Sequence, residues 1–277
     1  QQALPLPGVG PELKELETLT AFDGTLLPAL PKMAWALWRD EEHRAVKVHL
    51  TFEVLKGIPS LATVTDGNAS EKKQLRRMLK PNRLYVHDRG LSEYKLFQDI
   101  IDAGSSFIGR LRDNAVWTVI EERPVSEEAR KVGVQRDLVV RLGCEGKQED
   151  LRQPVRVVEV HAWTRESDGK PTILLLVTDR MDLPSELVAL GYRFRWSIEL
   201  FFRWFKRVLG CLHLLSCSLE GIEIQVYVAL IASLLITIWT GRKPTKRTFE
   251  MLCFYLSGWA SEDEVAAHIE KLANAKA

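Results

Sequence analysis

The sequence predicts an α/β protein: a mixed sheet flanked by helices, interrupted by a β-rich insertion and followed by a helical C-terminal tail. Short apolar runs alternate with amphipathic stretches over residues 19–112, β-branched residues dominate the block at 113–170, and helical patterns follow Pro184. Of the 277 residues, 46% are hydrophobic and 27% are charged, which is the composition of a chain that folds around a core. Intrinsic disorder and fibrous repeats are excluded.

The first half of the chain is expected to follow the order βββαβαβ. After a helical stretch at 12–18, strands are predicted at 19–25, 44–55, 60–67, 83–88 and 106–112, with helices at 71–80 and 93–104. Ser92 is the expected cap of the second helix. Asp23 and Asp88 each end a strand, where open α/β sheets usually place their chemistry. Asp66, in a turn, and Asp102, late in a helix, are competing acids that we interpret as structural.

The total charge does not indicate a partner, because 38 Lys and Arg residues stand against 37 Asp and Glu residues. A nucleic-acid site must therefore come from local clusters. The sequence contains two, one formed by Lys72, Lys73, Arg76, Arg77, Lys80 and Arg83 and one by Arg242, Lys243, Lys246 and Arg247. Phosphate contacts are the expected use of both clusters, and a solvated helix face is the equally weighted alternative for the first.

Several other classes of site are not expected. Four cysteines without a CxxC pair indicate reduced thiols, and the spacing of Cys211, His213 and Cys217 matches no zinc site. The apolar stretch Val226–Trp239 is shorter than the roughly 20 residues that cross a bilayer, so a buried helix is predicted. The N-terminus has no signal-peptide pattern and begins without Met, so we expect an upstream segment to be missing.

The most specific pattern lies in the helical region at 184–210. Four polar residues fall within an arc of roughly 60° at about 100° per residue, namely Tyr192, Arg195, Glu199 and Lys206. Arg203 lies at the edge of this stripe. The opposite face is apolar and consists of Leu200, Phe201, Trp204, Phe205, Val208 and Leu209. The alternative is a solvated face of ion pairs, but the spacing Y-x2-R-x3-E-x6-K should arise by chance in only about one chain in a thousand.

Asp23 in FDGT, Asp88 in VHDRG, the β-rich block and the Y-R-E-K spacing together resemble the DDE transposases of bacterial insertion sequences, in particular the insertion-sequence-four group. The resemblance covers nearly the whole chain and implies a ribonuclease-H-like core. It implies that Asp23, Asp88 and Glu199 are the catalytic residues and metal ligands. It also implies that the stripe binds transposon-end DNA through Tyr192, Arg195, Arg203 and Lys206.

The implied function is metal-dependent DNA cleavage at transposon ends followed by strand transfer. Gly24 departs from the Ser or Thr of many relatives, and the strand at 172–177 lacks the Trp of some hairpin-forming relatives, so a hairpin intermediate stays open. Two other functions also stay open. The first is a non-catalytic or domesticated DNA-binding relative, and the second is a metal-dependent nuclease without strand transfer.

Carboxylate chemistry supports a metal site at these acids. Three clustered carboxylates repel one another unless divalent cations neutralise them, and oxygen ligands without His or Cys favour Mg²⁺ or Mn²⁺. Two such ions, about 3.5–4 Å apart, support in-line displacement at a phosphodiester. The implied partners are double-stranded DNA, both inverted-repeat ends and target, and a second copy of the chain in the DNA complex. No membrane partner is expected, and the implied location is the bacterial cytoplasm, in association with the nucleoid.

The order of the three acids predicts a core that is discontinuous in sequence. Asp23 and Asp88 precede the β-rich block, whereas Glu199 follows it. We therefore expect a first core half at 15–112, an insertion at 113–170, a second core half at 171–210 and a helical C-terminal region at 211–277.

Overall fold

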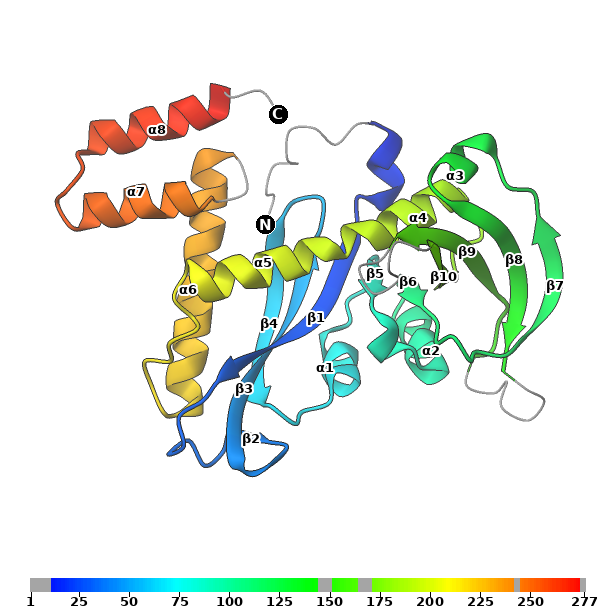
Figure 1. Ribbon diagram of the computed structural model, residues 1–277, viewed down its shortest axis with the longest axis horizontal. Helices are drawn as coiled ribbons and strands as arrows, with labels where there is room; N and C mark the ends of the chain where they lie inside the picture. Colours follow the sequence, from blue (N-terminus) through cyan, green and yellow to red (C-terminus); the bar gives the residue numbers. More distant parts are fainter. Residues whose placement is uncertain (1–10, 144–150, 164–170, 242–244, 275–277) are drawn as a thin grey trace. The chain divides into compact units, whose positions relative to one another are not determined.

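The computed structural model describes residues 11–143, 151–163, 171–241 and 245–274 (Figure 1). The chain forms two compact units. The sheet unit comprises Leu13–Asp23 and Ser70–Trp196, and the tail unit comprises Gly24–Ala69 and the described residues from Ser197 onward. Strand β1 (Leu19–Pro28) belongs to the sheet unit up to Asp23 and to the tail unit beyond it. Of the residues considered above, Cys144, Arg242, Lys243 and the opening at 1–10 lie outside the described ranges.

The sheet unit is built on a mixed sheet. Its strands are hydrogen-bonded in the order β1, β5 (Leu84–His87), β6 (Ser106–Arg110), β10 (Pro171–Thr178), β9 (Val155–Trp163), β8 (Val134–Leu142) and β7 (Trp117–Arg123). β5 is parallel to β1 and β6 is parallel to β5, whereas each later strand in this order is antiparallel to the one before it. The α/β class and the mixed sheet predicted from the sequence are confirmed.

Helices cover both faces of the sheet. They are η1 (Pro11–Leu16), α1 (Glu71–Met78), η2 (Arg89–Leu91), α2 (Tyr94–Asp102), α3 (Glu127–Lys131) and α4 (Ser185–Phe194). Of these, α2 and α4 lie on opposite faces of the parallel strands, and α3 lies beside β8. On one face, Phe97 of α2 stacks on the buried ring of His87, with 5.6 Å between ring centroids. On the other face, Gly191 lets α4 approach β6, because a Cβ at this position would lie 2.9 Å from Ile108 Cδ1.

The β-rich block extends the sheet beyond β10, which pairs with β6 on one side and with β9 on the other. A buried ion pair joins β8 to β9, since Asp137 and Arg156 are each 3% exposed. Arg156 donates from Nε to Asp137 Oδ1 at 2.7 Å and from Nη2 to Oδ2 at 2.5 Å. Its Nη1 also donates to the carbonyl of Leu183, just before α4. The pair therefore ties the block to the segment that leads into α4.

The tail unit combines a hairpin with helices. β3 (Asp40–Glu53) is hydrogen-bonded to β1 and pairs antiparallel with β4 (Ile58–Asp66) and the short β2 (Leu37–Trp38). The helices are α5 (Trp196–Arg207), α6 (Leu219–Thr240), α7 (Lys246–Leu256) and α8 (Glu262–Asn274). α6 packs along β4, where the Tyr227 hydroxyl donates to the Ala62 carbonyl at 3.0 Å (Figure 1). The ring of Phe201 in α5 packs on the ring of Phe52 in β3, with 5.1 Å between the ring centroids.

The helix predicted over 184–210 is divided. α4 ends at Phe194 and α5 begins at Trp196. Arg195 between them keeps helical dihedral angles (φ −50°, ψ −33°), but its amide donates to the carbonyl three residues back, at Tyr192, as in a 3₁₀ turn. Ser92 was also assigned wrongly, because it closes η2 and Glu93 occupies the N-cap position of α2.

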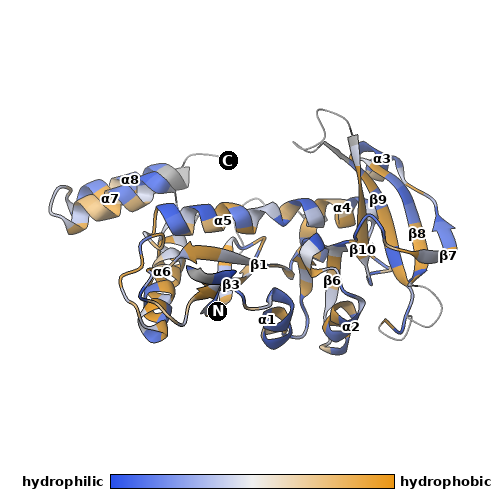
Figure 2. Ribbon diagram, turned by 60° about the horizontal axis from the view of Figure 1, so that its bottom comes forward, coloured by the Kyte–Doolittle hydropathy of each residue, from blue (hydrophilic) through white to orange (hydrophobic). Residues whose placement is uncertain are grey.

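The helix predicted at 226–239 is α6, but it is buried on one side only, so the prediction that it is buried is wrong for its other face. This helix has 22 residues and is the one helix in the described part of the chain that is long and apolar enough to cross a membrane by length and composition. Figure 2 shows hydrophobic colouring along it, in contrast to the hydrophilic α1. One side packs within the tail unit, but Ile224 is 65% exposed and Ile238 is 68% exposed.

The buried ion pair yields a stability prediction. Asp137→Asn should lower the free energy of unfolding by about 3–5 kcal/mol, because it leaves the Arg156 guanidinium buried beside a neutral amide. The matched control is Glu122→Gln, which removes the ion pair that Glu122 forms with Arg136 through two hydrogen bonds. Both side chains are exposed, so the free energy of unfolding should not change. Urea unfolding followed by circular dichroism measures both variants. Equal effects would contradict the role assigned to the buried pair.

Candidate active site and nucleic-acid interface

Two predicted site residues lie side by side on adjacent parallel strands. The strand predicted to end at Asp23 continues as β1 to Pro28, so Asp23 lies within β1, whereas Asp88 directly follows β5. The register of β1 and β5 pairs Ala21 with Val86. Two residues further along, the same register brings Asp23 opposite Asp88, whose backbone is still extended (φ −80°, ψ −178°). Neighbouring strands are about 4.8 Å apart, and paired residues of a parallel ladder point to the same face. The two carboxylates therefore share one face of the sheet unit.

A cation continues this row on the next strand. β5 and β6 pair His87 with Gly109, so Arg110 lies opposite Asp88. Gly109 is required here because the His87 ring occupies the position of a side chain, 2.5 Å from where a Cβ would lie. Burial lowers the pKa of His87, so the ring is neutral at pH 7 and acts as packing beneath the row. Asp23, Asp88 and Arg110 thus form one row across three strands.

Asp88 is held in place by the short helix that follows it. Its Oδ1 accepts hydrogen bonds from the backbone N–H groups of Gly90 at 2.9 Å and Leu91 at 3.3 Å. Both bonds end on the same oxygen. Within the described residues, Oδ2 is the oxygen that remains available to a ligand.

Beside Asp88 is an open cavity of about 770 Å³. Its lining consists of Asp88, Arg89, Gly90, Arg110, Arg112, Asp113, Asn114, Tyr192 and Arg195. Four arginines stand against two aspartates, and Asp113 already pairs with Arg89 at 2.9 Å. The cavity is therefore net positive, which suits an anionic ligand such as a phosphate.

Arg110 carries unused hydrogen-bonding capacity into this cavity. Among the described residues its Nε is buried without a hydrogen-bond partner, and its Nη2 lies 3.8 Å from Asp113. A buried donor without a partner costs free energy, and a phosphate oxygen would satisfy it.

Tyr192 and Arg195 enter the same cavity from α4 and the turn after it. The Arg195 guanidinium carbon lies 5.8 Å from the centre of the Tyr192 ring, within cation–π range. Burial raises the pKa of Tyr192, while the charges of Arg195 and Arg110 oppose that rise. The phenol is therefore neutral at pH 7 and available as a hydrogen-bond donor. Two of the four residues predicted to bind DNA thus lie around Asp88.

The remaining predicted residues lie on α5 in the tail unit. The helix buries Ile198, Phe201, Phe202 and Phe205, while Glu199 and Lys206 are half-buried and Arg203 is exposed. Burial lowers the pKa of Lys206. Leu200, expected on the apolar face, is 48% exposed. Across the ranges that the structure describes, no three His, Cys, Asp or Glu side chains are gathered as a metal site.

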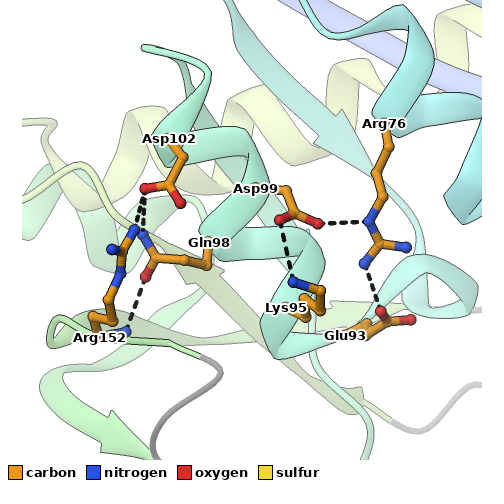
Figure 3. Close-up of polar contacts among 7 residues, drawn as sticks. All are labelled: Arg76, Glu93, Lys95, Gln98, Asp99, Asp102 and Arg152. Atoms are coloured by element: carbon orange, nitrogen blue, oxygen red, sulfur yellow. Dashed lines mark hydrogen bonds and ion pairs between the residues drawn. The ribbon is translucent and has the colours of Figure 1, made fainter.

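The first basic cluster is partly used in internal contacts, which Figure 3 draws together with a neighbouring network. Arg76 donates to Asp99 at 2.5 Å and to Glu93 at 2.6 Å, and Lys72 pairs with Glu93 at 2.8 Å. These bonds connect α1 to α2. The network around Asp102 is also structural, because Gln98 and Arg152 both donate to its carboxylate. The remaining cations of this cluster are accessible, and Lys73, Arg77 and Lys80 are exposed.

Sequence reasoning missed Arg110, Arg112 and Asn114. Arg110 is the last residue of β6 and the other two follow it, in the run GRLRDN, next to the strand β5 that precedes Asp88. Predicting them would have required the sheet order, because only the adjacency of β5 and β6 brings these residues to Asp88. The run of two arginines after a buried strand was the available signal.

Comparison with known proteins identifies the family. A family model described as the transposase DDE domain matches residues 14–235, which is most of the chain. The chain belongs to the DDE transposase domain family. The matched region of this DDE domain includes both aspartates of the row and Glu199.

Two relatives carry transposase names. The DDE domain is 29% identical over 222 residues to a Sinorhizobium fredii protein named "Putative transposase y4zB", covering 79% of this chain and 60% of the relative. It is 22% identical over 224 residues to the "Probable transposase for insertion sequence element IS5377" of Geobacillus stearothermophilus, covering 80% and 56%. The chain therefore spans less than two thirds of the length of these relatives.

The fold of the DDE domain is similar to that of a solved transposase. The match is to a chain of the cryo-electron microscopy structure of the piggyBac transposase synaptic complex with hairpin DNA, with a TM-score of 0.51 and 8% sequence identity. It covers 94% of this chain and 58% of that chain. At this identity the likeness concerns the fold alone.

The cavity predicts a loss of DNA affinity on removing its arginines. If the cavity binds DNA phosphates, Arg110→Ala and Arg195→Ala should each weaken binding to duplex DNA and reduce the log–log salt slope by about one, the change expected for one lost phosphate contact. The control, Arg136→Ala, removes the same charge from an exposed ion pair on β8 and should change neither quantity. Fluorescence anisotropy over a range of salt concentrations measures both. Unchanged slopes in the two cavity variants would exclude this cavity as a phosphate site.

Proposed function

We propose that this DDE domain carries the active site of a transposase that cleaves DNA at transposon ends and transfers the cut strand to target DNA. The observation that carries the proposal is the in-register pair of Asp23 and Asp88, next to a cavity of net positive charge. Paired carboxylates suit divalent metal ions, and arginines beside them suit the phosphates on which the reaction takes place.

Asp23, Asp88 and Glu199 are proposed as both the catalytic residues and the metal ligands. The donor set fits hard cations, because all three are carboxylates and Oδ2 of Asp88 remains available after Oδ1 is bonded to the backbone. Mg²⁺ or Mn²⁺ is the proposed cofactor, with two ions. Such ions supply charge neutralisation at the phosphodiester and at the attacking and leaving oxygens. What these residues contribute is a fixed arrangement of oxygen ligands.

Tyr192, Arg195, Arg203 and Lys206 are proposed to bind the backbone of the transposon end. Tyr192 and Arg195 line the cavity at Asp88, and Arg203 on α5 is exposed. Lys206 is half-buried, which lowers its pKa because the charged form is partly desolvated. A phosphate contact would compensate for that desolvation. This spacing of the Y-R-E-K residues supports membership of the insertion-sequence-four group.

A ribonuclease-H-like core is the proposed fold type, supported by the strand order β4, β3, β1, β5, β6 with β5 and β6 parallel to their neighbours. The core is proposed to be discontinuous, with halves at 15–112 and 171–210, the insertion at 113–170 and the helical region at 211–277. Its proposed partners are double-stranded DNA, at inverted-repeat ends and at the target, and a second copy of the chain. The proposed location is the bacterial cytoplasm, in association with the nucleoid.

The carboxylates can be tested by substitution in the full-length protein. Asp23→Asn, Asp88→Asn and Glu199→Gln should each reduce metal-dependent cleavage of a duplex bearing the element's inverted repeat by about 10³-fold or more, because each removes a charged metal ligand. Asn at position 88 keeps an oxygen that can cap η2, so folding should be preserved. Asp66→Asn, at the last residue of β4 in the tail unit, is the control and should leave cleavage intact.

A cysteine variant distinguishes a metal ligand from a residue that only supports folding. Asp88→Cys should be inactive with Mg²⁺ and regain cleavage with Mn²⁺, which accepts a thiolate more readily than Mg²⁺ does. Full activity of the Asn or Gln variants would remove the residue from the catalytic set. Cleavage without joining of the cut 3′ end to target DNA would indicate a nuclease, and binding without cleavage would indicate a DNA-binding relative.

A further inference from the structure

Helix α6 has two apolar faces, of which one is buried within the tail unit. The buried face includes Ile222, Val226, Leu230, Ser233 and Ile236. The outer face carries a row that we call the α6 seam, formed by Ile224, Val228, Ile231, Leu235 and Ile238. Each seam residue is between 53% and 68% exposed, and Trp239 beside them is 54% exposed. A helix that is apolar all round is normally covered on every side.

The spacing of the seam is that of a coiled coil. Successive residues are four, three, four and three positions apart, which is the a/d pattern of two heptads. A sustained period of 3.5 residues keeps one row of side chains facing a partner helix as the two supercoil. No charged residue follows Glu223 within the helix. The seam is therefore patterned to contact another helix along its whole length.

The exposed area is large enough for a stable interface. Each seam side chain would remove roughly 100 Å² from water, so the seam with Tyr227 and Trp239 would contribute roughly 700 Å². Two such surfaces would bury about 1,400 Å², within the range of specific protein interfaces. An uninterrupted apolar patch of this size exceeds what monomeric proteins usually expose.

A second copy of this chain is the occupant that the charges favour. Glu220 and Glu223 lie at the start of α6, which ends at Thr240. Lys246 and Arg247 begin the next described helix, where each forms an exposed ion pair with Glu250. If the α6 helices of two copies pair in opposite directions, the acids of each chain approach the cations of the other. The two helix dipoles then also point in opposite directions, which is favourable. A parallel copy would bring like charges together.

Insertion of α6 into a membrane is disfavoured by its inner face. The inner side of the helix packs along β4. Leaving the tail unit would expose the strand and break the bond from Tyr227 to Ala62.

We propose that the α6 seam is a self-association surface, on which two copies of this chain pair through antiparallel α6 helices with Ile231 at the two-fold axis. Pairing of identical patches closes the assembly at two copies. This inference rests on the proposed function in one respect, the pairing with a second copy, and it uses no residue of the candidate active site.

The first test is the mass of the DNA-free protein by sedimentation velocity. The 277-residue chain should sediment as two 31.5 kDa copies. The double variant Val228→Glu, Leu235→Glu should raise the dissociation constant by more than about 100-fold, because it places carboxylates in a desolvated seam. Leu215→Glu is the control; this residue is 86% exposed but precedes α6, so the dimer should persist. Circular dichroism and thermal unfolding must match the parent for each variant. A monomeric parent, or equal dissociation of control and seam variants, would overturn the proposal.

The second test is the direction of pairing by disulfide cross-linking. Mixed Ile224→Cys and Ile238→Cys chains should cross-link to each other, and neither should cross-link to itself beyond the level of the parent, whose Cys211, Cys217 and Cys253 are free thiols. Self-cross-linking of each single variant would establish parallel pairing and overturn the antiparallel arrangement. Binding of a monomeric parent to phosphatidylcholine vesicles would assign the face to a membrane and overturn the proposal.

Discussion

The parallel pairing of β1, β5 and β6 is the constraint on which the candidate site depends. Backbone hydrogen bonds determine which residues of neighbouring strands lie side by side, and alternation determines which of them share a face. In the observed register, Asp23, Asp88 and Arg110 fall in one row. A shift of β5 by one residue would put the Asp88 position on the side of the sheet that holds the buried ring of His87. The packing of His87 on one face of the sheet therefore determines that Asp88 lies on the other face, where the candidate site is.

That packing explains why the row can hold two carboxylates. His87 and Phe97 fill the space below the strand ends, and η2 fixes Asp88 through two backbone N–H groups. Cations lie beside the acids, since Arg110 follows in the same row and Arg195 lines the same cavity. This arrangement supports the proposal that the carboxylates hold cations and the arginines contact phosphates.

Much of this arrangement was predictable from the sequence. Alternating apolar residues indicated the strands, and Asp88 was predictable from its position at a strand end. Asp23 was placed at a strand end wrongly, because β1 continues to Pro28. The adjacency of the two acids was not predictable, because it depends on strand order and register. The same limitation hid Arg110, whose partner strand is known only from the sheet. The division at Arg195 and the exposure of Leu200 were missed for another reason, since a helical wheel assumes one unbroken helix with one buried side. The prediction that α6 is buried on all sides was wrong for one face. Apolar composition predicts that a helix is covered, but it does not tell whether the covering residues belong to the same chain or to another.

The central claim is that Asp23 and Asp88 together hold a divalent cation. Electron paramagnetic resonance of Mn²⁺ titrated into the DNA-free protein measures this directly, because the free hexaaqua ion gives a signal that is lost on binding. Mn²⁺ should bind the parent chain at the paired aspartates, and Asp23→Asn or Asp88→Asn should each weaken that binding at least about tenfold by removing one charged ligand. Unchanged Mn²⁺ binding in both variants would contradict the claim.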